Sequence, residues 1–116
     1  MGDGARGVGS AARGSRSVNP DRVELAPEAR ADLDDVVAYV EVRNPVAAAD
    51  ILAKVTATLA ALAAPDPRLD GPPTRLNTGV PCRRYVVHPV ALYYDRAPGV
   101  VVVLRIYHHA REPIAR

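Results

Sequence analysis

The sequence predicts an α+β fold in which a short N-terminal strand and an αα-hairpin pack on one face of a small antiparallel β-sheet. Two stretches of the 116-residue chain carry apolar residues at helical spacing and follow one another closely. A proline-rich loop comes next, and three strand-like runs separated by short turns complete the pattern. Because neither amphipathic helix can bury its apolar stripe alone, both need the sheet as a second layer.

The first predicted elements are a strand and a helix. Val23-Glu24-Leu25 alternates as a strand does, and Pro27 suits the first position of a helix because its missing N–H is not needed there. Between residues 28 and 43, one core-facing side is predicted from the helical spacing of Ala29, Leu33, Val36, Val37 and Val40. The acidic residues lie mainly on other faces, and they are Asp32, Asp34, Asp35 and Glu41.

A second helix is expected over residues 46–64. Asn44 caps a helix well and Pro45 is tolerated in a first turn, so this short connection forces the two helices to lie antiparallel. The expected apolar stripe consists of Ala48, Ile51, Leu52, Val55, Leu59 and Leu62. Leu52 lies in the middle of this stripe and is therefore expected to be buried against the sheet.

The C-terminal half is predicted to form a β-meander. Residues 65–73 hold four prolines and Gly71, which predicts a loop, and strand-like runs follow at residues 83–87, 91–95 and 100–107. Side chains alternate along a strand, so the last run is expected to turn one set towards the helices, namely Val102, Leu104, Ile106 and His108. The alternating set points to the opposite, open face of the sheet, namely Val101, Val103, Arg105, Tyr107 and His109.

Composition narrows the class of protein further. Residues 1–20 hold five of the eight glycines and almost no large apolar side chain, which predicts a disordered tail before a single domain at residues 21–116. Cys82 is the only cysteine, and this favours a reducing, cytoplasmic setting. The N-terminus has no apolar signal-peptide core, and no stretch approaches the roughly 20 apolar residues of a membrane helix. No membrane partner is expected.

Charge divides the chain into two unlike halves. Residues 21–66 carry four basic and nine acidic side chains, a net charge of −5. Residues 67–116 carry eight arginines against three acidic side chains, a net charge of +5. The arginine-rich half is therefore the predicted contact region for an acidic partner or a phosphate backbone.

Several short motifs occur in a specific order and spacing. They are Ala26-Pro27-Glu28-Ala29 with Asp32-Leu33, Asn44-Pro45 with Ala48-Ala49, Gly79 before Arg83-Arg84, Tyr93-Tyr94, and Leu104-Arg105-Ile106-Tyr107-His108 closing at Arg111. Together these residues resemble the RelE/ParE superfamily of toxins from type II toxin-antitoxin systems. The closing Arg-Ile-Tyr-His-x-x-Arg is more similar to the ParE branch than to the RelE branch. The resemblance runs from about Val23 to Arg111.

The resemblance implies a toxin that inhibits DNA gyrase, is neutralised by a cognate antitoxin, and meets DNA only indirectly through that antitoxin. It implies no cofactor. One alternative is a RelE-like, ribosome-dependent mRNA endonuclease, and another is a degenerate homologue that only binds antitoxin. RelE-type relatives usually have a C-terminal tyrosine, whereas here nothing aromatic follows Tyr107 and the only lysine is Lys54. A non-catalytic, ParE-like toxin is therefore favoured.

The candidate partner-binding residues are Arg83, Arg84, Arg105, Tyr107 and Arg111. A nuclease would need phosphate-binding cations and proton-transfer groups, which would come from Arg83, Arg84, Arg105, His109 and Arg111. Adjacent residues of a strand point to opposite faces, so His108 and His109 do not suit a shared site. Arg105 lies within a valine-rich strand and must reach solvent or find a carboxylate, for which the antitoxin is a plausible source.

The remaining reactive residues suggest structural roles. Arg83 and Arg84 cannot both face one side of a strand, and of Tyr93 and Tyr94 one is expected to be packed and the other exposed. Cys82 has no histidine at useful spacing and is expected to be inert. One cysteine and a histidine pair cannot supply three or four convergent ligands, so no metal site is predicted.

Overall fold

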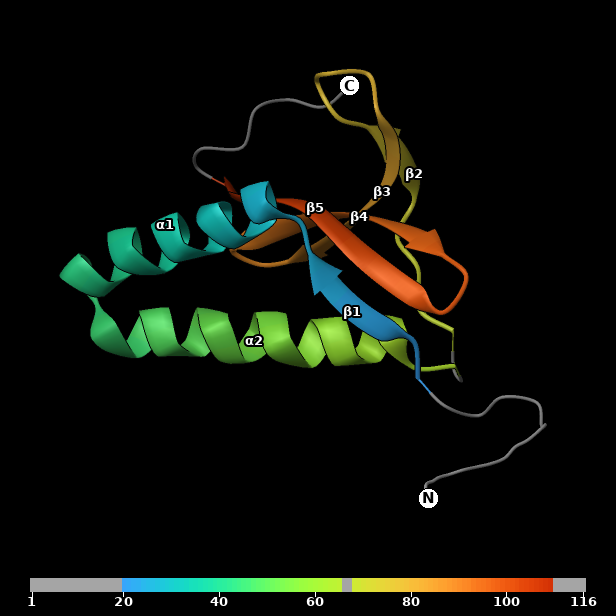
Figure 1. Cartoon of the computed structure of the whole chain (residues 1–116). Helices are drawn as coiled ribbons and strands as arrows, with labels where there is room; N and C mark the ends of the chain where they lie inside the picture. Colours follow the sequence, from blue (N-terminus) through green and yellow to red (C-terminus); the bar gives the residue numbers. More distant parts are fainter. Residues whose placement is uncertain (1–19, 66–67, 110–116) are drawn as a thin grey trace.

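The computed structural model describes residues 20–65 and 68–109 and arranges them as a helical hairpin on one face of a sheet (Figure 1). The elements are β1 (Arg22–Leu25), α1 (Pro27–Arg43), α2 (Pro45–Ala63), β2 (Pro73–Arg75), β3 (Pro81–Val87), β4 (Val90–Ala97) and β5 (Val100–His108). The predicted α+β class is confirmed. Of the expected tail, only Pro20 falls within the described residues.

The five strands form one sheet in the order β1-β5-β4-β3-β2. Strands β2 to β5 pair antiparallel, so the predicted meander is present, but β1 pairs parallel to β5 and makes the sheet mixed. The expected loop ends earlier than predicted, because β2 begins at Pro73. Proline is tolerated there since β2 is an edge strand with one side free of ladder bonds.

Local signals in the sequence set the ends of the helical hairpin. Pro27 and Pro45 begin the two helices, and the Asn44 side-chain oxygen accepts a hydrogen bond of 3.1 Å from the Ala47 backbone N–H. The turn between the helices projects beyond the sheet in Figure 1. Val42 and Val46 flank this turn and are therefore 84% and 79% exposed.

Helix α2 packs through a narrower stripe than the sequence predicts. Its buried side chains include Ile51, Val55 and Leu62, whereas Leu52 is 45% exposed, so the expected burial of Leu52 is wrong. With its outer side uncovered, α2 has the length and composition of a membrane-spanning helix, with a mean hydropathy of 1.7. The expectation that no stretch of the sequence approaches a membrane helix is therefore wrong by length and composition, although α2 contributes to the core against the sheet.

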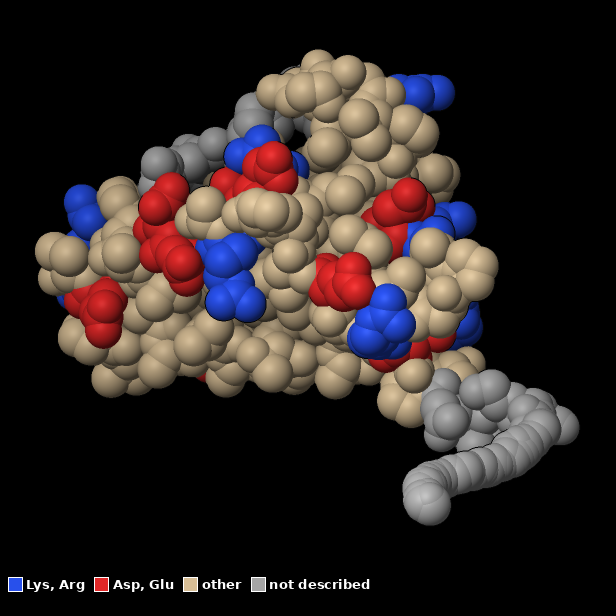
Figure 2. Space-filling view, viewed as in Figure 1, with Lys and Arg blue, Asp and Glu red and all other residues tan. Residues whose placement is uncertain are grey.

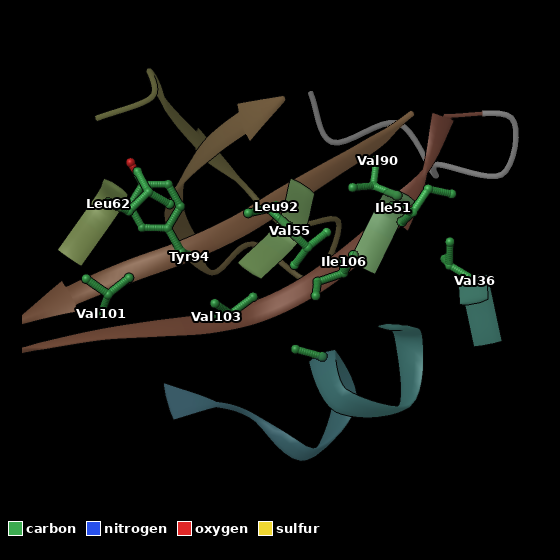
Figure 3. Packing of buried hydrophobic residues seen from close by; sticks show 11 residues of the cluster. Val36, Ile51, Val55, Leu62, Val90, Leu92, Tyr94, Val101, Val103 and Ile106 are labelled. Carbon is green, nitrogen blue, oxygen red and sulfur yellow. The ribbon is translucent and has the colours of Figure 1, made fainter. Parts of the chain in front are cut away.

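The main core lies between the hairpin and the sheet (Figure 3). It is mostly aliphatic, with side chains from both helices facing those of β4 and β5, and includes Val36, Ile51, Val55, Leu62, Val90, Leu92, Tyr94, Val101, Val103 and Ile106. The Tyr94 ring is fully buried within this core. The Tyr94 hydroxyl donates to Asp70 (2.9 Å) and accepts from the Gly71 N–H (2.8 Å), which satisfies it.

Gly71 allows the loop before β2 to lie directly on β3. A β-carbon at this position would stand 1.9 Å from the Arg84 carbonyl oxygen, a distance that no side chain can occupy. The close approach also lets the Arg83 guanidinium donate to the Gly71 carbonyl at 2.8 Å. Glycine is therefore required here by proximity and not by backbone angle.

A second, smaller apolar cluster covers part of the open face of the sheet. It contains Cys82, Ala91 and Tyr93, with Leu76, Leu104 and Tyr107 packed against them. Leu76 comes from the segment between β2 and β3, which folds over this face. Tyr93 and Tyr94 are consequently both buried, and the expectation that one of them is exposed is wrong.

A β-bulge in β5 changes which side chains face the helices. Tyr93 pairs with Arg105 while Tyr94 pairs with Val103, so Leu104 is the extra residue. Val101 and Val103 lie in the main core and Leu104 lies in the second cluster, opposite to the predicted alternation. Val102 alternates with its neighbours and is also misassigned. Beyond the bulge, Ile106 faces the helices and Tyr107 faces the open side, as predicted.

Candidate partner-binding site

The side chain of Arg105 on β5 is hydrogen-bonded to α1. Its guanidinium donates to both carboxylate oxygens of Asp32, at 2.7 and 2.9 Å. Asp32 also accepts the backbone N–H of Ile106 at 3.0 Å, and the Tyr107 ring lies 4.9 Å from the guanidinium carbon. The hydrogen bonds that Arg105 donates to Asp32 raise the pKa of Arg105 against the opposing effect of burial.

This geometry gives Arg105 a different carboxylate from the one expected. The sequence suggested an acidic partner protein, but α1 supplies the charge from within the chain. Sequence reasoning did not single out Asp32, although Glu28, Asp32 and Asp35 recur at the i, i+4 and i+7 spacing of one helix face. That spacing was the signal in the sequence for an acidic face on α1. Only the position of β5 in the folded chain shows that Arg105 lies against this face.

A cavity of about 450 Å³ opens beside this ion pair. It lies between α1, the C-terminal half of β5 and Asn77 from the turn after β2, and is lined by Asp32, Asp35, Val36, Asn77, Arg105, Ile106, Tyr107 and His108. The lining combines two carboxylates with one guanidinium, an aromatic ring, an amide and an imidazole. Such a mixture suits a polar, charged side chain of a partner better than an apolar one.

The other predicted arginines lie apart from this cavity. Arg84 is on the open face, where its Nε donates to the Tyr93 hydroxyl at 3.1 Å. Arg83 points the other way, to the Gly71 carbonyl. The Tyr93 and Tyr107 rings meet edge to face with centroids 5.6 Å apart, so the open face carries an aromatic pair next to Arg84.

Two of the histidines, His88 and His109, lie together at one end of the sheet, whereas His108 lines the cavity. The His109 ring stands edge-on to His88 with centroids 5.2 Å apart, and the His109 backbone N–H donates to the Pro89 carbonyl. The His108 ring faces Tyr39 of α1 at 6.3 Å. Arg111 lies outside the described residues. The predicted nuclease set therefore converges at no single point within the described part of the chain.

Two further predictions concern reactive groups. Cys82 is buried, and burial raises the pKa of its thiol, which keeps it protonated and unreactive. Among residues 20–65 and 68–109, no group of three or more histidine, cysteine, aspartate or glutamate side chains is placed to hold a metal ion.

Sequence reasoning missed a second arginine centre, around Arg96 of β4. Its guanidinium donates to Asp70 at 2.7 Å and to Asp21 at 3.4 Å, and to the backbone carbonyls of Leu62 and Leu69 at 2.8 Å each. Burial acts to raise the pKa of Asp70, but hydrogen bonds from Arg96 and Tyr94 outweigh it and leave that pKa below its usual value. No local pattern marks Arg96, because its partners are scattered along the chain.

Two solved structures share this arrangement of hairpin and sheet. One is described as a chromosomal ParDE toxin-antitoxin system from P. aeruginosa, with a TM-score of 0.62, 18% identity, and coverage of 76% of this chain and 95% of that chain. The other is the toxin-antitoxin complex RelBE2 from Mycobacterium tuberculosis, with a TM-score of 0.55, 21% identity, and coverage of 83% and 99%. The fold is therefore of the RelE/ParE type.

The family itself is given by the sequence match. A family model described as the ParE toxin of a type II toxin-antitoxin system, parDE, matches residues 23–113. The chain belongs to this ParE toxin family. No curated protein sequence matches it.

Proposed function

We propose that this toxin blocks DNA gyrase without cutting nucleic acid, and that a cognate antitoxin silences it. The family assignment supports the general class, and the ParE model favours gyrase over the ribosome as the target. One structural observation supports the proposal that the toxin does not cut nucleic acid. Arg83, Arg84 and Arg105 each donate to a group of the fold itself, and they do so in three different directions.

Ribonuclease chemistry needs a different arrangement. A base must activate the 2′-hydroxyl, an acid must protonate the leaving oxygen, and cations must surround the phosphate. His109 stacks against His88 at one end of the sheet, while Arg105 lies four residues away and is neutralised by Asp32. Four strand residues span roughly 13 Å, which exceeds the reach of direct proton transfer to a phosphate held at Arg105.

The expected partner is an antitoxin, which by analogy binds the toxin surface and carries any contact with DNA. The solved relatives are both described as toxin-antitoxin systems. In this proposal the protein encoded beside this one supplies the antitoxin, and the two are purified as a complex from which the toxin is released for assay.

The test compares two purified targets. Released toxin is added to gyrase with relaxed plasmid, and separately to a translating ribosome extract whose mRNA is mapped by primer extension. We expect supercoiling to be inhibited and the mRNA to stay intact. Codon-positioned cleavage with unaffected gyrase would replace the proposal with the endonuclease function. Antitoxin binding without either activity would make the chain a homologue that only binds antitoxin.

A matched variant separates the two activities further. His109 is exposed at the end of β5, so His109→Ala should leave folding intact. Gyrase inhibition should be unchanged in this variant. A loss of toxicity together with a loss of mRNA cleavage would instead identify His109 as a proton-transfer group and contradict the proposal.

A further inference from the structure

The cavity beside Arg105 carries more negative charge than its own residues neutralise. Glu28, Asp32 and Asp35 lie along one face of α1, and the charge of Glu28 acts on Arg105 together with that of Asp32. Arg105 is the only arginine or lysine that lines the cavity within the described part of the chain. The described lining therefore holds two carboxylates, Asp32 and Asp35, against one guanidinium.

The ion pair with Asp32 leaves Asp35 unmatched. Both oxygens of Asp32 are occupied by Arg105 and by the Ile106 N–H. Asp35 also lines the cavity, its side chain is exposed, and none of the described residues forms an ion pair with it. Figure 2 shows several acidic side chains on the left of the molecule, where α1 lies, with basic side chains among them.

An anion does not suit this cavity. The guanidinium edge that would grip a carboxylate or phosphate is already bound to Asp32, and a second anion would add to the surplus negative charge. A cation, by contrast, would be attracted by the surplus negative charge. It finds Asp35 unpaired, the Tyr107 ring as one wall and the Asn77 side chain as another. A volume of about 450 Å³ admits a long side chain and not only an ion.

We propose that this cavity receives an arginine or lysine side chain of the antitoxin, with Asp35 as its counter-charge. The inference rests on the proposed function, because it names the partner that a toxin of this family requires. It also reverses the expectation drawn from net charge, since the contact next to Arg105 is supplied by a basic and not an acidic partner residue. Arginine fits better than lysine because its planar group pairs with a carboxylate and stacks on an aromatic ring.

The chain offers a matched control for this test. Asp34 and Asp35 are neighbours on α1, both exposed and both negatively charged, but only Asp35 lines the cavity. Long-range attraction of a basic partner is the same for both carboxylates, so a difference between Asp34→Asn and Asp35→Asn reports on contact in the cavity.

The first experiment is calorimetric titration of the full-length toxin with the antitoxin encoded beside it. Asp35→Asn should raise the dissociation constant by about 10-fold or more and flatten its dependence on salt, as expected for removal of an interfacial charge pair. Asp34→Asn should stay within about 2-fold of the wild type. Equal effects of the two substitutions, or no effect of either, would overturn the inference while leaving antitoxin binding established.

A second probe does not depend on the antitoxin. Agmatine, a small guanidinium compound, is titrated into labelled toxin and followed by NMR. It should shift the amide signals of Asp35, Ile106 and Tyr107 in the wild type and not in Asp35→Asn. If the antitoxin fails to bind wild-type toxin, the proposed function is wrong, and the agmatine result then decides the cation site alone. Absence of those shifts overturns the site.

The chain's own C-terminal Arg111 is the competing occupant. Stability of the free toxin is measured for Asp35→Asn, Arg111→Ala and the double variant. Additive effects are expected when the cavity is kept for a partner. Clear coupling between Asp35 and Arg111 in the free toxin would show that the site is filled from within, which contradicts the proposal.

Discussion

Two arginines, Arg96 on β4 and Arg105 on β5, both pair with carboxylates of the chain, but their surroundings differ. Arg96 has a side chain only 14% exposed and bonds to two carboxylates and two backbone carbonyls. Arg105 is 34% exposed, bonds to the single carboxylate of Asp32, and borders an open cavity. The first centre is mostly buried and bonded to four acceptors of the chain, whereas the second borders a cavity that another molecule can reach.

The partners of each arginine explain this difference. Those of Arg96 come from the start of β1, the end of α2 and the loop before β2, so one guanidinium holds together segments that are far apart in sequence. Those of Arg105 come from one helix that already packs over β5. Stability is therefore expected to depend mainly on Arg96, and recognition mainly on the surroundings of Arg105.

The largest expected effect is on folding at the Arg96 centre. Arg96→Met removes the ion pairs with Asp70 and Asp21 and leaves the partly buried carbonyls of Leu62 and Leu69 without this donor, which should cost about 3–5 kcal/mol in the free energy of unfolding. Urea denaturation monitored by circular dichroism measures this. Arg22→Met is the control, because Arg22 is highly exposed and pairs only with Glu24, so its loss should cost less than about 0.5 kcal/mol. Similar losses in both variants would remove the distinction between the centres.

A smaller effect is expected at Asp32. Asp32→Asn keeps an acceptor for the Ile106 N–H but removes the charge opposite Arg105, which can partly rehydrate because it is 34% exposed. A loss of about 1–2 kcal/mol follows, after allowance for solvent screening. The same denaturation measurement applies, with Asp34→Asn as a control of equal charge. If Asp32→Asn lowers the free energy of unfolding as much as Arg96→Met does, the ion pair of Arg105 stabilises the fold as strongly as the bonds of Arg96.

The smallest effect concerns acid stability at the Arg96 centre. Arg96 and Tyr94 hold the pKa of Asp70 in the folded chain below its usual value, despite the opposing effect of burial. A depressed folded pKa stabilises the fold above about pH 4, the ordinary aspartate value, and this contribution is lost as the pH falls through the lower folded pKa.

The check is the difference between wild type and Asp70→Asn in urea denaturation at pH 6, 4 and 3. The gap should be widest at pH 6 and should narrow on acidification. Subtraction removes the contributions of the other carboxylates. A gap that stays constant with pH would assign the stabilisation by Asp70 to packing and not to charge.

Much of the fold was predictable because local residues set it. Pro27 and Asn44-Pro45 mark the helix starts through their own backbone and side-chain chemistry, and Pro98-Gly99 separates the last two strands. These signals act within a few residues and do not depend on distant partners. The ends of the predicted helices and of the three predicted meander strands therefore agree with the structure to within about two residues, whereas strand β2 was not predicted.

The failures share a different cause. Leu52 matches the helical period as well as Ile51, and only the position of α2 relative to the sheet decides which of them is buried. Because of the bulge at Leu104, Val101 and Val103 face the side of the sheet opposite to the predicted one, and no residue type in β5 predicts a bulge there. Each depends on how two elements meet, which periodicity within one element cannot show.

The candidate site follows the same division. The need of Arg105 for a carboxylate was predictable from its apolar surroundings, but the identity of Asp32 depends on α1 lying over β5. The cavity and its surplus charge are likewise products of packing. Arg96 was missed altogether, because its four partners come from segments that meet only in the folded chain.

Asp32 also has a consequence for solubility. Strand β1 pairs with β5 only from Val100 to Val103, so the outer margin of β5 beyond that point has no strand beside it among the described residues. Such a margin is a template on which other chains assemble into aggregates. By accepting the Ile106 N–H, Asp32 occupies a donor that an incoming strand would use. The carboxylate that neutralises Arg105 is thus also expected to hinder self-association of the chain through this margin of its sheet.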